Sequence, residues 1–341
     1  MNLKPIVFLI LLFNYSVCAQ SFKSEVDYLS YFNSQESTIS QRYLSYVSES
    51  AHGNKLRKIE QKRNDVVNAL KAVQANINKL KPYKGDTLLK KNYETYITLL
   101  NSVFNEDYGK IVDLEEIAEQ SYDQMEAFLL AQEQADAKLS DAQDQFTDAF
   151  RRYAAANNIR LLENKSQLEK KMMKIGQANK YYHQIYLVFF KAFKQEAYLL
   201  DAVQHKDLNG VEQNRNTLKK YSLEGMAKLD TAKAFKSNQT LLQSAKKYLL
   251  FTKNESDKIS QFNDYIMKTD EFDKVKKAYE MLGKNKTNEE IDSYNLAVKS
   301  VNKAISDYNS EMQQLDKNRS VALNYWNTSA KAFFETYIPK E

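Results

Sequence analysis

The chain has 341 residues with 43% hydrophobic and 12% aromatic side chains, which can form a sizeable core and exclude a disordered polypeptide. Its 7 glycines and 3 prolines are too few for the tight turns of an all-β protein of this length. The net charge is +5, and lysine and glutamate are mixed without a long block of like charge, which indicates an ordinary solvated surface.

The first nineteen residues predict a secretory signal peptide. Lys4 precedes an apolar run over 5–13, and Val17 and Ala19 place small side chains before a cleavage site that follows Ala19. We therefore expect an exported protein that is periplasmic, bound at the outer-membrane surface or secreted, with no nucleic-acid partner. No later segment is apolar enough to predict a transmembrane span.

Cys18 is the only cysteine and lies within this signal. Cleavage after Ala19 would leave a mature chain without a thiol, disulfide or cysteine-based metal site. Lipidation of Cys18 is the alternative, but Val17 and Tyr15 occupy positions where a lipoprotein signal prefers a small residue and leucine. These flanking residues favour ordinary cleavage.

Abundant Lys, Glu, Gln, Ala and Leu predict an all-α fold. Stop and start signals predict about eight helices. The expected breaks lie at 51–54, 82–86, 105–109, 157–158, 205–210, 236–238, 253–256 and 283–287. Thr287 and Glu290 form a Thr-x-x-Glu capping box that should begin the last helix.

Apolar residues recur at alternating spacings of three and four along 114–153, 168–203 and 291–333. Such heptad-patterned helices turn one face toward partner helices, which predicts antiparallel bundles. One helix over 110–156 would extend roughly 70 Å, so we expect an elongated molecule.

The order of segments suggests a tandem duplication. Residues 59–64 match 211–216 in sequence, and the breaks at 83–86 and 235–238 follow at the same interval. We therefore expect an N-terminal helical bundle over 20–160 and a C-terminal bundle over 161–341, with about twenty extra residues near 255–275. The alternative is that amphipathic helices of similar composition match by chance.

A signal ending in Cys18, Ala19 and Gln20, followed by helical residues rich in Lys, Glu, Asn and Tyr, resembles uncharacterised surface and envelope proteins of Bacteroidota-like Gram-negative bacteria. The resemblance extends over the mature chain in its general composition and helical character, and it includes no specific sequence motif. It implies an exported helical protein and assigns no activity and no functional residues.

Patterns that carry catalysis or bind metal are weak in this sequence. Glu49 and His52 form a single Glu-x-x-His pair, whereas di-iron bundles need two such pairs and further carboxylates. Neither a Gly-x-Ser-x-Gly elbow nor a glycine-rich phosphate loop occurs. We therefore expect no enzyme, cofactor or metal site.

The aromatic block over 181–193 has two interpretations. It is either the buried middle of a bundle helix, which we favour, or the wall of a pocket for an apolar ligand formed by Tyr182, Tyr186, Phe189 and Phe193. Separately, two Asp-Thr-apolar triplets resemble O-glycosylation sites of Bacteroidota-like envelopes. Their acceptors would be Thr87 and Thr231.

We therefore expect a non-enzymatic surface or envelope protein that acts as a helical binding or structural module. Its partner would be an unknown envelope protein or surface ligand. Contact with a membrane surface stays open because basic clusters such as Lys170, Lys171 and Lys174 could meet phosphates. The alternative is a carrier or sensor that holds a small apolar ligand between helices, and an envelope hydrolase is a distant third.

Overall fold

The computed structural model describes residues 22–52, 55–161, 167–259, 261–338 and 340. The described residues contain ten α-helices and no strand, which confirms the all-α class. The helices are α1 (Glu25–His52), α2 (Leu56–Lys79), α3 (Leu88–Ser102), α4 (Tyr108–Ala118), α5 (Tyr122–Ala156), α6 (Gln167–Gln204), α7 (Leu208–Thr231), α8 (Thr240–Lys258), α9 (Gln261–Met281) and α10 (Asn288–Tyr337). The predicted signal peptide, with Cys18 and Ala19, lies outside the described residues.

Polar side chains fix several helix starts by satisfying backbone N–H groups that have no partner within the helix. The Asp207 carboxylate accepts from the Gly210 N–H at the start of α7. At the start of α10 the Thr287 hydroxyl accepts from the Glu290 N–H, and the Glu290 carboxylate accepts from the Thr287 N–H. The predicted capping box is therefore confirmed.

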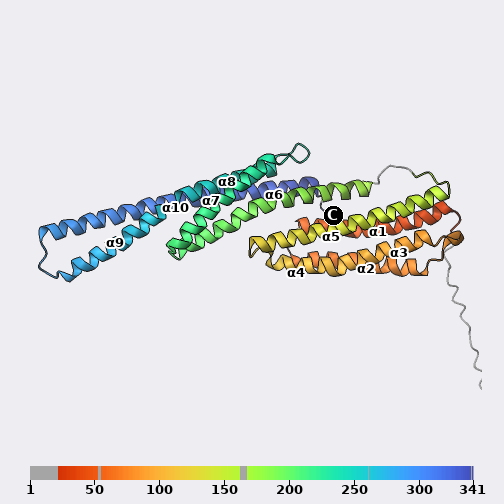
Figure 1. The fold of residues 1–341 in the computed structure, drawn as a ribbon, viewed down its shortest axis with the longest axis horizontal. Helices are drawn as coiled ribbons and strands as arrows, with labels where there is room; N and C mark the ends of the chain where they lie inside the picture. Colours follow the sequence, from red (N-terminus) through yellow and green to blue (C-terminus); the bar gives the residue numbers. More distant parts are fainter. Residues whose placement is uncertain (1–21, 53–54, 162–166, 260, 339, 341) are drawn as a thin grey trace, which may run out of the picture.

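Figure 1 shows an elongated molecule in which two groups of helices follow one another along the long axis. In the first group α1 packs on α2, α2 on α3, α3 on α5 and α4 on α5. In the second group α6 packs on α7, α7 on α8, α8 on α10 and α9 on α10. The helices of the second group thus pack in the same order as those of the first.

The expected continuous helix over 110–156 is wrong, because the chain breaks between α4 and α5. Ser121 takes an extended backbone conformation there, and its hydroxyl accepts from the Gln124 N–H to start α5. The expected break at 105–109 is also absent, since a π-helical segment, η2 (Val103–Asp107), joins α3 to α4. The Arg63 guanidinium donates to the Phe104 carbonyl at 2.6 Å and thereby supports this wider turn.

The two groups meet at α6, which contacts both α5 and α1. The Lys191 ammonium on α6 lies 5.1 Å from the centre of the Tyr122 ring on α5. A ring N–H of His52, at the end of α1, donates to the Ile338 carbonyl just after α10. These contacts connect the N-terminal bundle both to α6 and to Ile338, which follows α10.

No helix among the described residues is long and apolar enough to cross a membrane. This agrees with the expectation drawn from the sequence.

Candidate functional site

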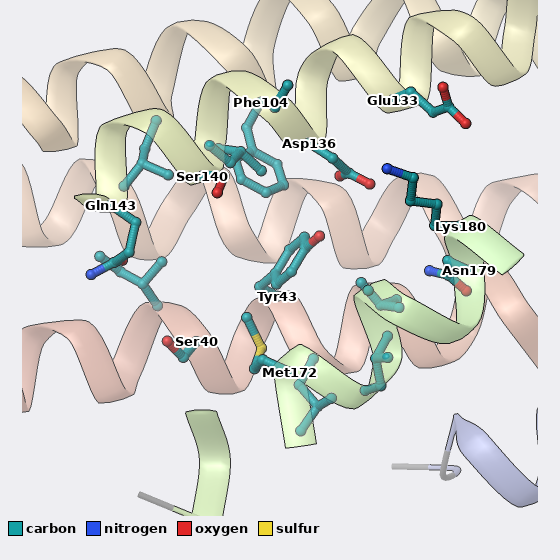
Figure 2. A pocket seen from close by; sticks show the side chains of 18 of the residues that line it. Ser40, Tyr43, Phe104, Glu133, Asp136, Ser140, Gln143, Met172, Asn179 and Lys180 are labelled. Atoms are coloured by element: carbon teal, nitrogen blue, oxygen red, sulfur yellow. The ribbon is translucent and has the colours of Figure 1, made fainter. Parts of the chain in front are cut away.

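A cavity of about 590 Å³ lies between the N-terminal bundle and α6. Its lining comes from α1, α3, η2, α5 and α6, so both helix groups contribute to it (Figure 2). Ligand pockets in proteins commonly enclose about 300–1,000 Å³, so this cavity has room for a small organic molecule.

Large aliphatic side chains and methionine from four helices form the apolar part of the walls. They are Ile39, Leu44, Val47, Leu100, Leu139, Met172 and Ile175. Gly176 on α6 also borders the cavity, and a β-carbon placed on it would meet no atom within 4 Å. Gly176 is itself exposed, so the space beside its backbone at this wall is open.

Carboxylates from α5 give one part of the cavity an acidic character. Asp136 faces the cavity and accepts a hydrogen bond from the Tyr108 hydroxyl at 2.6 Å. Asp136 is solvent-accessible within the cavity, and partial loss of hydration still raises its pKa, although this hydrogen bond opposes the shift. Glu133, one turn earlier, is exposed, and the Lys180 side chain extends from α6 toward the carboxylates of Asp136 and Glu133 (Figure 2).

Among the described residues, no ammonium or guanidinium group lies within ion-pair distance of Asp136. His183 on α6 also lines the cavity, and loss of hydration lowers its pKa to about 4. This imidazole is therefore uncharged at neutral pH and supplies no counter-ion.

Aromatic rings adjoin the same acidic part of the cavity. The Phe104 ring stacks on Tyr108, with centroids 4.8 Å apart, and the Tyr43 ring meets Phe104 edge-on at 5.8 Å. Phe104 belongs to η2, so the π-helical segment positions this ring. Tyr43 and Phe104 line the cavity itself, while Tyr108 reaches Asp136 from behind.

A half-buried carboxyl group lies beside the cavity wall. Glu36 on α1 accepts hydrogen bonds from the hydroxyls of Tyr93 and Tyr96, each at 2.9 Å. The Tyr96 oxygen also lies 2.6 Å from the side-chain oxygen of Gln143. Burial raises the pKa of Glu36 to about 7. Since one hydroxyl proton cannot serve two acceptors, Tyr96 donates either to Glu36 or to Gln143, and when Glu36 is protonated the carboxyl group can donate to Tyr96 while Tyr96 donates to Gln143.

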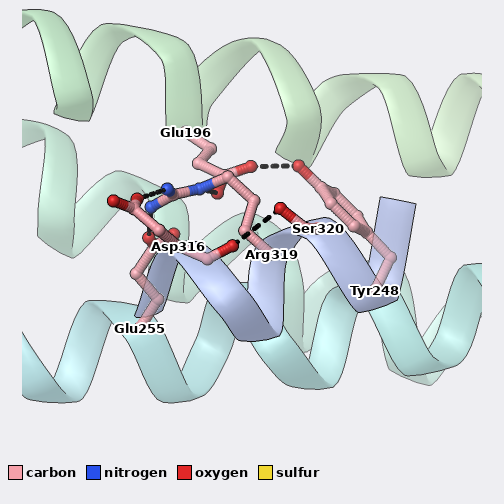
Figure 3. Close-up of polar contacts among 6 residues, drawn as sticks. All are labelled: Glu196, Tyr248, Glu255, Asp316, Arg319 and Ser320. Atoms are coloured by element: carbon pink, nitrogen blue, oxygen red, sulfur yellow. Dashed lines mark hydrogen bonds and ion pairs between the residues drawn. The ribbon is translucent and has the colours of Figure 1, made fainter. Parts of the chain in front are cut away.

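The C-terminal bundle holds a second buried polar cluster, shown in Figure 3. Arg319 on α10 donates to Glu196 on α6 at 2.6 Å and also to Glu255 on α8. The Tyr248 hydroxyl donates to the other oxygen of Glu196. Burial, together with the charge of Glu196, raises the pKa of Glu255 to about 9. Because Glu196 and Glu255 are only 2% and 0% exposed, this cluster joins three helices within the core.

The aromatic residues proposed from the sequence as a pocket wall pack within the C-terminal bundle. Tyr182 contacts Phe334 at 4.4 Å between ring centroids, and Phe189 stacks on Trp326 at 4.2 Å. Tyr186 stacks on Tyr182, and Phe193 stacks on Phe189. The α6 residues that line the cavity are instead Met172, Ile175, Gly176, Asn179, Lys180 and His183.

The two threonines expected to carry glycans are both exposed. Thr87 directly precedes α3, and Thr231 ends α7, where its hydroxyl donates to the Lys228 carbonyl at 2.9 Å. Both positions are accessible to a modifying enzyme.

Sequence reasoning missed the α1 and α5 walls of the cavity. A signal was present on α5, where Glu133, Asp136, Ser140 and Gln143 form a polar stripe with spacings of three, four and three beside the apolar stripe. Such a stripe predicts that one face of the helix is polar. It does not predict that α6 packs over this face.

No cluster of three or more His, Cys, Asp or Glu side chains that could hold a metal ion occurs in the described part of the chain. Comparisons with protein-family models, curated proteins and solved structures found no match to this chain.

Proposed function

We propose that this chain is a non-enzymatic exported protein of the cell envelope or surface, and that it binds a partner protein through the hairpin formed by α9 and α10. The single observation that carries the proposal is that this hairpin, which projects beyond the rest of the helices (Figure 1), has large apolar side chains exposed to solvent.

Exposed apolar side chains occur along both helices of the hairpin. Met267, Met281 and Leu296 are 64%, 85% and 73% exposed, and among the described residues of α9 only Phe262 and Ile266 are buried. Methionine adapts its shape to different contacts and is common at binding surfaces. Burial of such side chains against a partner would contribute about 25 cal/mol per Å² of apolar area.

The hairpin is also stiffened before any partner binds. The rings of Tyr265 and Tyr308 stack with centroids 4.5 Å apart, and those of Tyr279 and Tyr294 stack at 4.1 Å. A preorganised surface loses less conformational entropy on association, which favours binding.

Photo-crosslinking in the native envelope fraction tests this surface. A photoreactive side chain at position 281 should give a discrete adduct with a partner protein, whereas the same group at position 88 should not. Leu88 is a matched control because it is 58% exposed but lies on the N-terminal bundle. Leu296→Lys should weaken the adduct formed at position 281. Equal labelling at both positions would count against the proposal.

Export is part of the same proposal and rests on the signal-like sequence of residues 1–19. Protein purified from the native host should begin at Gln20. Palmitate label retained at Cys18 would instead indicate a lipoprotein.

We further propose that the two helix groups arose by duplication. One support is that the helices of both groups pack in the same order. A second is that Tyr96 and Tyr248 are separated by the same number of residues as Ile59 and Val211, the first residues of the matching segments. Each tyrosine donates to a glutamate of the first helix in its group. These two glutamates differ by about two helical turns in relative position, so the repeat is approximate.

A further inference from the structure

We infer that the cavity between α1, α5 and α6 binds a small organic ammonium compound with an apolar body. This site is separate from the hairpin and does not depend on the proposed partner.

The acidic part of the cavity provides the counter-charge for such a ligand. Asp136 faces the cavity and accepts from Tyr108 at 2.6 Å, which holds its carboxylate in place. Among the described residues, no cation pairs with Asp136, so one carboxylate oxygen is free to meet an incoming ammonium group. Glu133, which is exposed, adds a second carboxylate to the lining.

Aromatic rings beside this carboxylate suit an organic cation better than a metal ion. The half-buried Tyr43 ring borders the same part of the cavity as Asp136, whereas Phe104, only 1% exposed and stacked on Tyr108, supports this wall from within the core (Figure 2). Ring faces attract ammonium groups, and this attraction strengthens where water is excluded. A carboxylate next to aromatic rings is therefore a suitable environment for an alkylated or primary ammonium head group.

The remaining walls select an apolar body. Leu44, Val47, Leu139 and Ile175 offer only hydrocarbon to a ligand, and the volume of about 590 Å³ admits a chain or ring system attached to the head group. An anionic ligand is disfavoured, because Glu133 and Asp136 together outnumber the single lysine of the lining, Lys180, and because His183 is neutral.

Calorimetric titration of the mature full-length protein tests the inference with octyltrimethylammonium as the probe. Octanol and octanoate serve as neutral and anionic probes of the same chain length. We expect the ammonium compound to bind at least about tenfold more tightly than either, as an ion pair combined with a cation–π contact should provide. Equal or tighter binding of octanoate or octanol, or no binding of the ammonium compound, would overturn the inference.

Two cavity variants locate the binding site. Asp136→Asn keeps an acceptor for Tyr108 but removes the charge, so affinity for octyltrimethylammonium should fall about tenfold. Gly176→Leu should abolish binding because the leucine side chain would occupy the empty space beside α6. Leucine also favours a helix more than glycine does, so this variant should fold. Binding retained by Gly176→Leu would place the ligand elsewhere and refute the inference.

Asp144→Asn is the matched control on the same helix. Asp144 is exposed and does not line the cavity, so this variant should bind like the unmodified protein. A loss as large as that of Asp136→Asn would show a general effect of charge and would contradict the site. Circular dichroism checks the folding of each variant, and if Asp136→Asn does not fold, Gly176→Leu decides the result.

Discussion

In each helix group a glutamate of the first helix meets a tyrosine of the third, but Glu196 is buried whereas Glu36 is half-buried, and their electrostatic partners differ. Glu196 is hydrogen-bonded by Arg319, which supplies a positive charge. Glu36 is instead hydrogen-bonded by the two neutral hydroxyls of Tyr93 and Tyr96. Loss of hydration therefore dominates at Glu36 and raises its pKa to about 7.

Glu36→Gln should remove a pH dependence of stability. A carboxyl group whose pKa is higher in the folded state binds more protons when folded, so its contribution to stability falls as pH rises from about 4.5 to about 7 and stays lost above that. Glutamine mimics the protonated group. We therefore expect Glu36→Gln to raise the free energy of unfolding at pH 8 by about 1–3 kcal/mol relative to the unmodified chain, with little difference near pH 4.

Urea unfolding at several pH values between about 4 and 8 measures this effect. Glu280→Gln is a suitable control, because Glu280 is exposed on α9 and its variant should follow the pH profile of the unmodified protein. A Glu36→Gln profile parallel to that of the unmodified protein would show that Glu36 ionises freely in the folded state.

At the scale of the element, polar caps decide where helices begin. The heptad spacing over 114–153 runs through Ser121, and apolar residues follow at the same spacing on either side of it, so periodicity alone predicted one helix there. The overlooked signal was Ser121 followed three positions later by Gln124, which has the spacing of a capping box. The same kind of signal at Thr287 was recognised and predicted the start of α10 correctly.

Thr287→Ala should destabilise the start of α10 by about 1 kcal/mol, because the Glu290 N–H loses its side-chain acceptor. Hydrogen exchange read out by mass spectrometry should accelerate over the first turns of α10. Exchange in α1–α5 should not change, since these helices lie far from the tip of the hairpin (Figure 1). Unchanged exchange at the start of α10 would mean that the packing of α9 on α10, rather than the cap, fixes this terminus.

At the scale of the whole molecule, the helices form an extended arrangement with α6 at the junction of the two groups. A compact domain of this chain length would have a radius of gyration of about 20 Å. Small-angle X-ray scattering of the mature protein should give a clearly larger value and an asymmetric distance distribution with a long tail. A value near that of the compact domain would show that the hairpin folds back onto the bundles in solution.

The sequence by itself determined the helical class, most of the breaks and the capping box at Thr287, because these depend on residue composition and on contacts between neighbours in the chain. Only the tertiary structure decided where the cavity lies. Asp136, Tyr43 and Gly176 come from three helices that are far apart in sequence, and the face of α6 that meets α1 and α5 follows from how the two groups dock. Helix periodicity shows which residues share a face, but not which other helix that face will meet.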